Sequence, residues 1–303
     1  MTRRSITVLT ARSRIAALVF ALACGACATA ASRPDWEHRL QGNAVLMLGE
    51  VHDNPLQHQL RLESLRRAFA AGWRPTIAME QFDRERQVDI DRARRERPKD
   101  AQYLIEAAAP SNGRPGGGWN WDLYRPFVAL ALEYDVPLIA VNLSSSDATK
   151  IVRGGYAAVF DAASIAALKL DQPVAPDWQA AQEREIDDGH CHMLAQAMWP
   201  QMAKAQFARD AVMAALLREH SQNGVVLLAG NGHVRRDIGV PRWLDGAMRE
   251  RVFIVGYVES SDQSASAFDA VVQTAPAPRP DPCADFAKRR SAAPINSIIT
   301  ATN

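Results

Sequence analysis

The chain has 303 residues, with 35 Lys and Arg against 34 Asp and Glu, so its formal net charge is +1. Four of the positive charges lie in residues 1–23, which contain no acid, and losing that segment changes the net charge from +1 to −3. A chain that is acidic after processing has no electrostatic basis for binding nucleic acid, so that class of function is excluded. The remaining length suits one large α/β domain.

Residues 1–23 have the layout of a secretory signal peptide: an arginine-rich start is followed by an apolar run, residues 15–23, that is too short to span a bilayer. The stretch FALAC ends at Cys24, a pattern typical of a bacterial lipobox, in which this cysteine is lipidated and becomes the mature N-terminus. We therefore expect a lipoprotein; cleavage after the sequence ATA, without a lipid, is the alternative. The glycine after Cys24 favours an outer-membrane location facing the periplasm.

Apolar runs rich in branched residues recur along the chain and are separated by helical patterns. This alternation predicts an α/β domain, with a mostly parallel central sheet flanked by helices. In the helix after the first run, Leu62, Leu65 and Phe69 are expected on one face, and the charged residues on the others; these are Arg61, Glu63, Arg66 and Arg67. The predicted strands cover residues 44–49, 76–79, 137–141, 225–229 and 252–257.

The domain expected at residues 41–272 has less regular segments on both sides and an insertion within it. Residues 24–40 read as a tether, and residues 273–303 as a weakly structured tail rich in Pro, Ser, Ala and Thr. Residues 143–223 contain helical patterns broken by prolines and no convincing strand, which indicates a helical cap over the sheet.

Polar side chains follow most of the predicted strands where each strand ends. Because the carboxyl ends of parallel strands lie on one edge of a sheet, we expect these side chains to converge there. Two imidazoles and two carboxylates could bind a divalent metal, or act as general acids and bases, or form a polar network around a ligand. The residues are Glu50, His52, Glu80, Asn142 and His233.

Six stretches in order, over about residues 44–245, resemble the ChaN-like family of haem-binding, iron-regulated bacterial lipoproteins: LGEVHDNPLQH, AMEQFDRERQ, GWNWDLYRPFVALA, PLIAVN, AQFARDAVMA and LLAGNGHVRRDIGVP. The resemblance implies haem binding in iron acquisition. The same superfamily is similar to erythromycin esterases and TIKI-type metalloproteases, whose corresponding motifs are catalytic and implicate Glu50, His52, Glu80 and His233 here. Gln206, Arg209 and Asp210 match a helical element of the pattern.

The resemblance also implies a tyrosine as the axial ligand of ferric haem. Of the five tyrosines we expect Tyr134 and Tyr257 to pack in the core. Tyr156, with Arg153 nearby, is the first choice of ligand. Tyr124 is the second, because Trp119 and Trp121 could flank a porphyrin; alternatively these aromatics pin their loop to the core.

Further candidates for contacts with haem are His190 and His192, which are two residues apart and so would point in different directions on a helix, where they could not easily share one metal. Arg235 is another candidate, because its charge suits a propionate. The expected function is haem binding by a lipid-anchored protein, with a possible homodimer and a haem-uptake receptor or periplasmic carrier as partners. The alternative is a metal-dependent or Glu/His hydrolase. Whether Cys191 and Cys283 pair stays open.

Overall fold

The computed structural model describes residues 45–110, 115–259, 265–281 and 283–284. Its centre is a sheet of six strands, all parallel, in the order β3-β2-β4-β1-β5-β6. The predicted fold class is therefore confirmed. The sixth strand, β6, was not predicted. The strands are β1 (Val45–Leu48), β2 (Thr76–Asp83), β3 (Leu138–Asn142), β4 (Val225–Leu228), β5 (Val252–Val258) and β6 (Ala270–Gln273).

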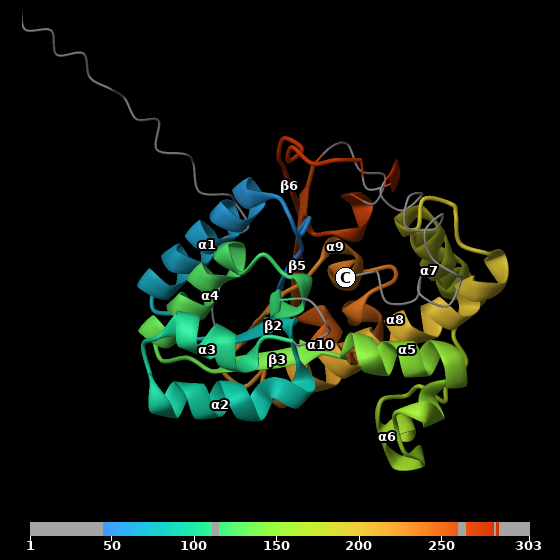
Figure 1. Ribbon diagram of the computed structural model, residues 1–303, viewed down its shortest axis with the longest axis horizontal. Coiled ribbons are helices and arrows are strands. Elements are labelled where there is room, and N and C mark those ends of the chain that lie inside the picture. Colours follow the sequence, from blue (N-terminus) through green and yellow to red (C-terminus); the bar gives the residue numbers. More distant parts are fainter. Residues whose placement is uncertain (1–44, 111–114, 260–264, 282, 285–303) are drawn as a thin grey trace, which may run out of the picture. The chain divides into compact units, whose positions relative to one another are not determined.

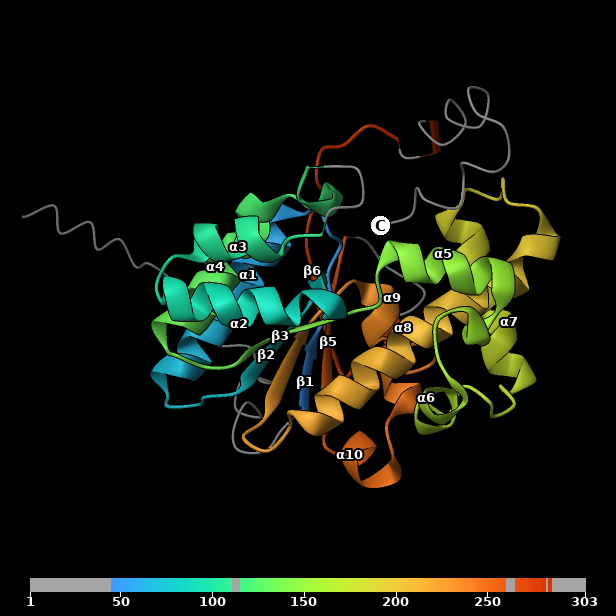
Figure 2. The same ribbon diagram turned by 60° about the horizontal axis from the view of Figure 1, so that its bottom comes forward.

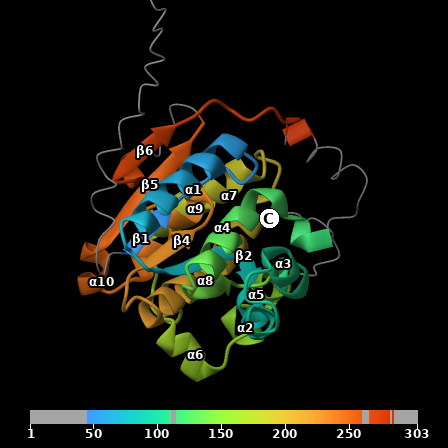
Figure 3. The same ribbon diagram turned by 90° about the vertical axis from the view of Figure 1, so that its left-hand side faces the viewer.

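Helices cover both faces of the sheet, so that strands buried on both sides are apolar at nearly every position (Figures 1 and 3). Val45 and Met47 of β1 point into one core, and Leu46 and Leu48 into the other. The second core is built with α1 (Pro55–Ala70), α2 (Gln87–Glu96), α3 (Ala101–Ala108) and α4 (Trp121–Glu133); the first with α5 (Ser145–Gly154), α7 (Pro176–Gly189), α8 (Trp199–Glu219), α9 (Asn231–Val234) and α10 (Gly246–Glu250).

The segment 143–223 folds into α5, α6 (Ala162–Ala167), α7 and α8, with one short 3-10 turn before α6 and another before α8. The long helix α8 lies along one face of the sheet and is buried over much of its length, while α5 and α7 pack against it (Figure 2). The segment therefore contributes most of one helical layer to the core, and α9 and α10 complete that layer. The 3-10 turns of the described chain are η2 (Arg84–Arg86), η3 (Pro115–Gly118), η4 (Tyr156–Ala158), η5 (Gln196–Met198), η6 (Val240–Trp243) and η7 (Ala265–Ala267).

Helix α1 differs from the expectation in one important way: Arg61 is fully buried. The buried face of α1 recurs every three to four residues, but only its C-terminal half is apolar, as at Leu65 and Phe69. The N-terminal half buries Gln57, His58 and Arg61. The assignment of Arg61 to a different face from Leu65 and Phe69 was wrong, because the apolar residues alone were taken to define the buried face. Arg61 is buried with them and pairs with a buried acid.

Cys191 and Cys283 form a disulfide between the loop after α7 and the C-terminal segment, 92 residues apart in sequence. None of the described helices is long and apolar enough to cross a membrane. The expected signal peptide at residues 1–23, the lipidation site Cys24 and the tether at 24–40 lie outside the described residues. So do residue 282 and all of the tail beyond residue 284.

Candidate functional site

Glu50 follows the end of β1 and is the centre of a buried cluster between the sheet and helices α1 and α4. Its carboxylate pairs with the guanidinium of Arg61. The hydroxyl of Tyr124 donates to Oε1 at 2.6 Å, and Nδ1 of His52 lies 2.8 Å from the same oxygen. The carboxylate therefore fixes the ring of His52 through Nδ1, and its other nitrogen, Nε2, faces away from Glu50.

A second cluster lies on the other face of the sheet, where Glu80 of β2 meets α8 and α9. His233 stands between two acids: its Nδ1 lies 2.6 Å from Oδ1 of Asp210, and its Nε2 lies 3.4 Å from Oε1 of Glu80. The backbone N–H of Gly230 donates to Oε2 of Glu80 at 2.7 Å. This arrangement holds the imidazole in place from both sides.

The two clusters meet at Gly230, a buried residue two positions after the end of β4. A Cβ at Gly230 would lie 2.8 Å from Nε2 of His52 and 3.7 Å from Oε2 of Glu80, so the ring of His52 rests against a residue that has no side chain. The predicted convergence of Glu50, His52, Glu80 and His233 at the strand ends therefore holds as two adjoining pairs. His52 is the exposed member, with 38% of its side chain accessible, against 0% for Glu50.

The fifth strand-end residue, Asn142, is buried beside Asp83 and takes no part in either pair. Its Nδ2 donates to Oδ1 of Asp83 at 2.9 Å. Burial, followed by the nearby charge of Glu85, raises the pKa of Asp83 to about 6. Asn142 therefore hydrogen-bonds a neighbouring acid, at the part of the sheet edge that β2 and β3 form.

Opposing effects set the protonation of the Glu80 cluster. Burial would raise the pKa of Glu80, but the charges of His233 and His52 and the N–H of Gly230 leave it below its ordinary value. Burial would lower the pKa of His233, yet Glu80 and Asp210 raise it. Burial raises the pKa of Asp210 to about 6. The cluster therefore favours an ionised Glu80 beside a protonated imidazole.

Burial also governs the Glu50 cluster. It lowers the pKa of His58 to about 4, so this imidazole is neutral near pH 7 and donates through Nε2 to the carbonyl of His52, 2.9 Å away. It lowers the pKa of Arg61 to about 10, which leaves the guanidinium charged. It raises the pKa of Tyr124, whose phenol stays protonated. Glu50 therefore accepts from neutral and positive donors.

Aromatic side chains border the exposed edge of His52. The ring of Trp119 contacts it edge-on, with 4.9 Å between the ring centroids, and lies 5.5 Å from that of Tyr124. Trp121 packs on Phe82 and Tyr124. Because the Tyr124 side chain is buried and its hydroxyl is bonded to Glu50, these contacts agree with the interpretation in which the aromatics pin their loop to the core.

Among the other tyrosines, Tyr156 lies in η4 and is half-buried against the core formed by α5, α7 and α8. No described residue makes a hydrogen bond to its hydroxyl, and burial raises its pKa to about 12. Arg153, three residues earlier, is exposed. Tyr257 is buried in β5, and Tyr134 packs on Phe69, so the predicted core packing of both is confirmed.

The candidate haem contacts in the segments after α7 and α9 already interact with other residues of the chain. His190 is buried, and its Nδ1 donates to the carbonyl of Ile186 at 2.6 Å. Arg235 pairs with Asp237 and with Glu185. His192 is exposed and lies with Asp187 and Asp188 in the one place where the described residues gather three possible metal ligands closely. The four strand-end acids and histidines form pairs instead.

Arg61 and His58 are the site residues that reasoning from the sequence missed. Both face Glu50 from α1, with Nδ1 of His58 lying 3.6 Å from Oε2 of Glu50. The sequence signal that could have identified them was their helical spacing. They are spaced so as to share a face with Asn54, which caps α1, and with Leu65, which is buried. A polar residue at a buried helical position, close to a strand-end acid, indicates such a partner.

Fold and site together define an α/β protein that carries an acid and imidazole site on the carboxyl edge of a parallel sheet. A family model described as "Haem-binding uptake, Tiki superfamily, ChaN" matches residues 36–244, well over half of the chain. The chain therefore belongs to this ChaN-like, haem-binding family, and the resemblance inferred from the sequence motifs is confirmed.

Solved structures resemble this one at low sequence identity. A ChaN of Campylobacter jejuni, described as binding haem cofacially, has a TM-score of 0.60 at 20% identity and covers 77% of this chain and 88% of its own. This similarity supports the assignment of the fold. An erythromycin esterase variant in its open conformation has a TM-score of 0.42 at 10% identity, with 71% and 70% covered. Among curated proteins, none matches the chain.

Proposed function

We propose that the protein binds haem at the strand-end edge of its sheet, beneath helices of segment 143–223, and takes part in haem or iron acquisition. The observation that carries the proposal is the match of residues 36–244 to a haem-binding family. The protein would be lipid-anchored through Cys24, in the outer membrane facing the periplasm. It would hold haem and either pass it to, or receive it from, an uptake receptor or a periplasmic carrier. A second copy of the chain would cover the haem face that one copy leaves open.

Tyr156 is the axial ligand that we favour. Its phenol is half-buried in an apolar setting and has no hydrogen-bond partner among the described residues. That setting disfavours a bare phenolate, so a ferric ion would have to stabilise it. The exposed Arg153 could pair with a propionate. Tyr124 supports the proposal less, because its hydroxyl already donates to Glu50.

The test is a titration of the protein lacking residues 1–27 with haemin, followed by absorption. We expect a saturable, stoichiometric shift, with the charge-transfer band typical of tyrosinate-ligated ferric haem. Tyr156→Phe should remove that band, whereas Tyr103→Phe, which changes a partly buried phenol on α3 whose hydroxyl donates to Glu96, should keep it. An unchanged spectrum in Tyr156→Phe would overturn the ligand assignment, and no shift in the parent protein would overturn haem binding.

A second candidate function, hydrolysis, is favoured by the geometry of His52. Buried Glu50 orients this imidazole through Nδ1, and the exposed ring lies against Gly230 next to Glu80. A partly exposed histidine that is oriented by an acid is arranged as a general base would be. Glu80 could then act as a second acid or base, or the four residues could take a divalent metal as an alternative cofactor.

Substitution separates the two functions. The double variant His52→Ala and His233→Ala should abolish any turnover of ester or peptide substrates while leaving haemin uptake nearly unchanged, if a tyrosine outside the clusters holds the iron. Elemental analysis of the purified protein tests the metal alternative. Loss of haemin binding in the double variant, with the fold intact by circular dichroism, would mean that the clusters themselves hold haem.

A further inference from the structure

The C-terminal strap, defined here as residues 274–281 with 283–284, leaves β6 and is fixed to the beginning of α1. The hydroxyl of Thr274 accepts from Nε2 of Gln57 at 3.0 Å. Nδ2 of Asn54 donates to the carbonyl of Ala275 at 3.0 Å, while Oδ1 of Asn54 caps α1. Gln57 also accepts from the N–H of Val51 at 2.7 Å. The near end of the strap is therefore bonded to residues that flank His52.

Arg279 adds a charged contact to the same loop. Its Nε lies 2.8 Å from Oδ2 of Asp53, the neighbour of His52 in sequence, and its guanidinium also pairs with Glu259. The N–H of Ala277 donates to the same Glu259 carboxylate at 2.9 Å. A change in the path of the strap would therefore act on residues 50–54, which we call the site loop.

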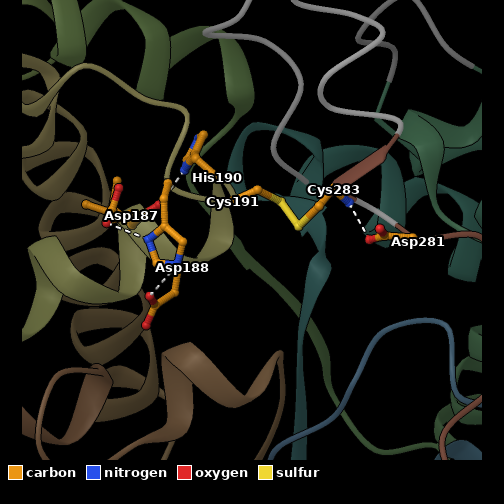
Figure 4. Close-up of a disulfide and its surroundings, with 8 residues drawn as sticks. Asp187, Asp188, His190, Cys191, Asp281 and Cys283 are labelled. Carbon is orange, nitrogen blue, oxygen red and sulfur yellow. Dashed lines mark hydrogen bonds and ion pairs between the residues drawn. A yellow bond between two sulfur atoms is a disulfide. The ribbon is translucent and has the colours of Figure 1, made fainter.

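The far end of the strap is held by the disulfide from Cys283 to Cys191, in the loop that follows α7 (Figure 4). That loop is itself anchored, since Nδ1 of His192 lies 2.7 Å from Oδ2 of Asp187. The helix α7 belongs to the layer opposite to α1. The strap thus joins the helical layer that supplies Arg61 to the layer that supplies Asp210 (Figure 2).

The composition of the strap makes it stiff. Proline occupies positions 276, 278 and 280 of the strap, every second residue. Each proline fixes its own φ and restricts the residue before it to extended conformations, and proline-rich segments of this kind act as semi-rigid spacers. A stiff strap transmits a constraint from one end to the other, which a flexible chain of equal length would absorb.

We propose that the Cys191–Cys283 disulfide is a redox latch, which through the strap sets how readily ligands exchange at the strand-end site. Reduction by a dithiol transfers two electrons and two protons to the disulfide, giving two thiols, while the dithiol is oxidised to its own disulfide. The near end of the strap then stays bonded at Asn54, and the far end is released. The exchange of haem at this site rests on the function proposed above.

Hydrogen exchange of the strap tests the latch without any ligand. We expect peptides covering residues 274–284 to exchange several-fold faster after treatment with dithiothreitol, and in Cys283→Ser without reductant, whereas peptides from β1 and β4 keep their protection. Dithiothreitol should change nothing further in Cys283→Ser. Equal exchange in the oxidised protein, the reduced protein and the variant would overturn the proposal.

Haemin release to a scavenging apoprotein tests the consequence at the site. We expect Cys283→Ser to release haemin several-fold faster than the oxidised parent, and Arg279→Ala, which cuts the contact to the site loop, to release it faster with the disulfide intact. Parent protein that binds no haemin would overturn the proposed function but leave the exchange test valid. Equal release rates, with faster strap exchange in Cys283→Ser, would show a strap uncoupled from the site and overturn the latch.

Discussion

Glu50 illustrates how a single side chain ties the site to the stability of the fold. Its buried carboxylate receives contacts from Arg61, Tyr124 and His52, which come from two helices and the site loop. When both charges of such a pair are buried, removing one leaves the other without compensation in a medium of low polarity. Substituting the residues that shape the site is therefore expected to destabilise the fold as well.

Arg61→Met should lower the free energy of unfolding by about 3 to 5 kcal/mol, because it strands the Glu50 carboxylate in the core. Urea unfolding followed by circular dichroism measures this loss. Arg66→Met, at an exposed position of the same helix, should stay within about 0.5 kcal/mol of the parent. A similar loss of unfolding free energy in the two variants would show that the buried Arg61–Glu50 pair does not stabilise the fold in this way.

His58 should make stability depend on pH. Its pKa is about 4 in the folded protein, below the ordinary value of 6.5, so the unfolded chain binds more protons between these values. Stability is then lost as the pH falls from 6.5 through 4, by about 2 to 3 kcal/mol at pH 4.5. Unfolding midpoints of the parent and of His58→Gln at pH 7 and 4.5 test this: the variant should show a weaker dependence, and equal dependence would contradict the assignment.

At this scale the sequence predicted the strand-end acids and histidines well, because each follows a recognisable apolar run. It did not predict the buried side chains that surround them. Arg61 and His58 look like solvated residues when only apolar spacing is counted, and the phenol of Tyr124 looks available for iron. Such pairings depend on which helix lies against which strand end, and that information is not local.

At the scale of elements, the turn from β4 into α9 decides whether the two clusters meet. Gly230 has ordinary backbone angles, with φ −60 and ψ 152, so its lack of a side chain matters for space rather than for conformation. The ring of His52 occupies the position that a Cβ would need.

Gly230→Ala should displace the ring of His52 from Glu80 and cost about 1 to 3 kcal/mol from overpacking. Gly232→Ala is the matched control: it lies two residues further on, in α9, where a Cβ meets nothing within 4 Å, and should stabilise by about 0.5 to 1 kcal/mol. Urea unfolding and the imidazole resonances of His52 report both effects. An unmoved His52 resonance in Gly230→Ala would refute the proposed contact.

Elements with a continuous apolar run were predictable, and β6 was not. Its four residues alternate between partly buried and exposed, and it lies at the edge of the sheet, so the run AVVQ gives little signal beside the tail that follows. The buried face of α1 was half predictable, since its C-terminal half is apolar and its N-terminal half is polar.

On the scale of the whole molecule, the family match ends at residue 244, before β5 and β6 begin. Yet β5 pairs with every residue of β1, through Val252 to Val255, and contributes Ile254 and Val255 to the core. A chain ending at residue 244 should therefore lack a cooperative unfolding transition, whereas a chain ending at residue 284 should keep it. Thermal unfolding by calorimetry distinguishes them, and a cooperative transition in the shorter chain would contradict the assigned role of β5.

The strand order also fixes when, during synthesis, the sheet can close. The central strand β1 has β4 and β5 as its neighbours, and these begin at Val225 and Val252. At about 5 to 20 residues per second, ribosomes need roughly 10 to 40 s to reach the end of β5 after making β1. For most of that interval, until β4 is complete at Leu228, the apolar run VLML has no partner strand. The nascent chain therefore needs either a holding chaperone or delayed compaction, and the earliest strand to be made is among the last to be paired.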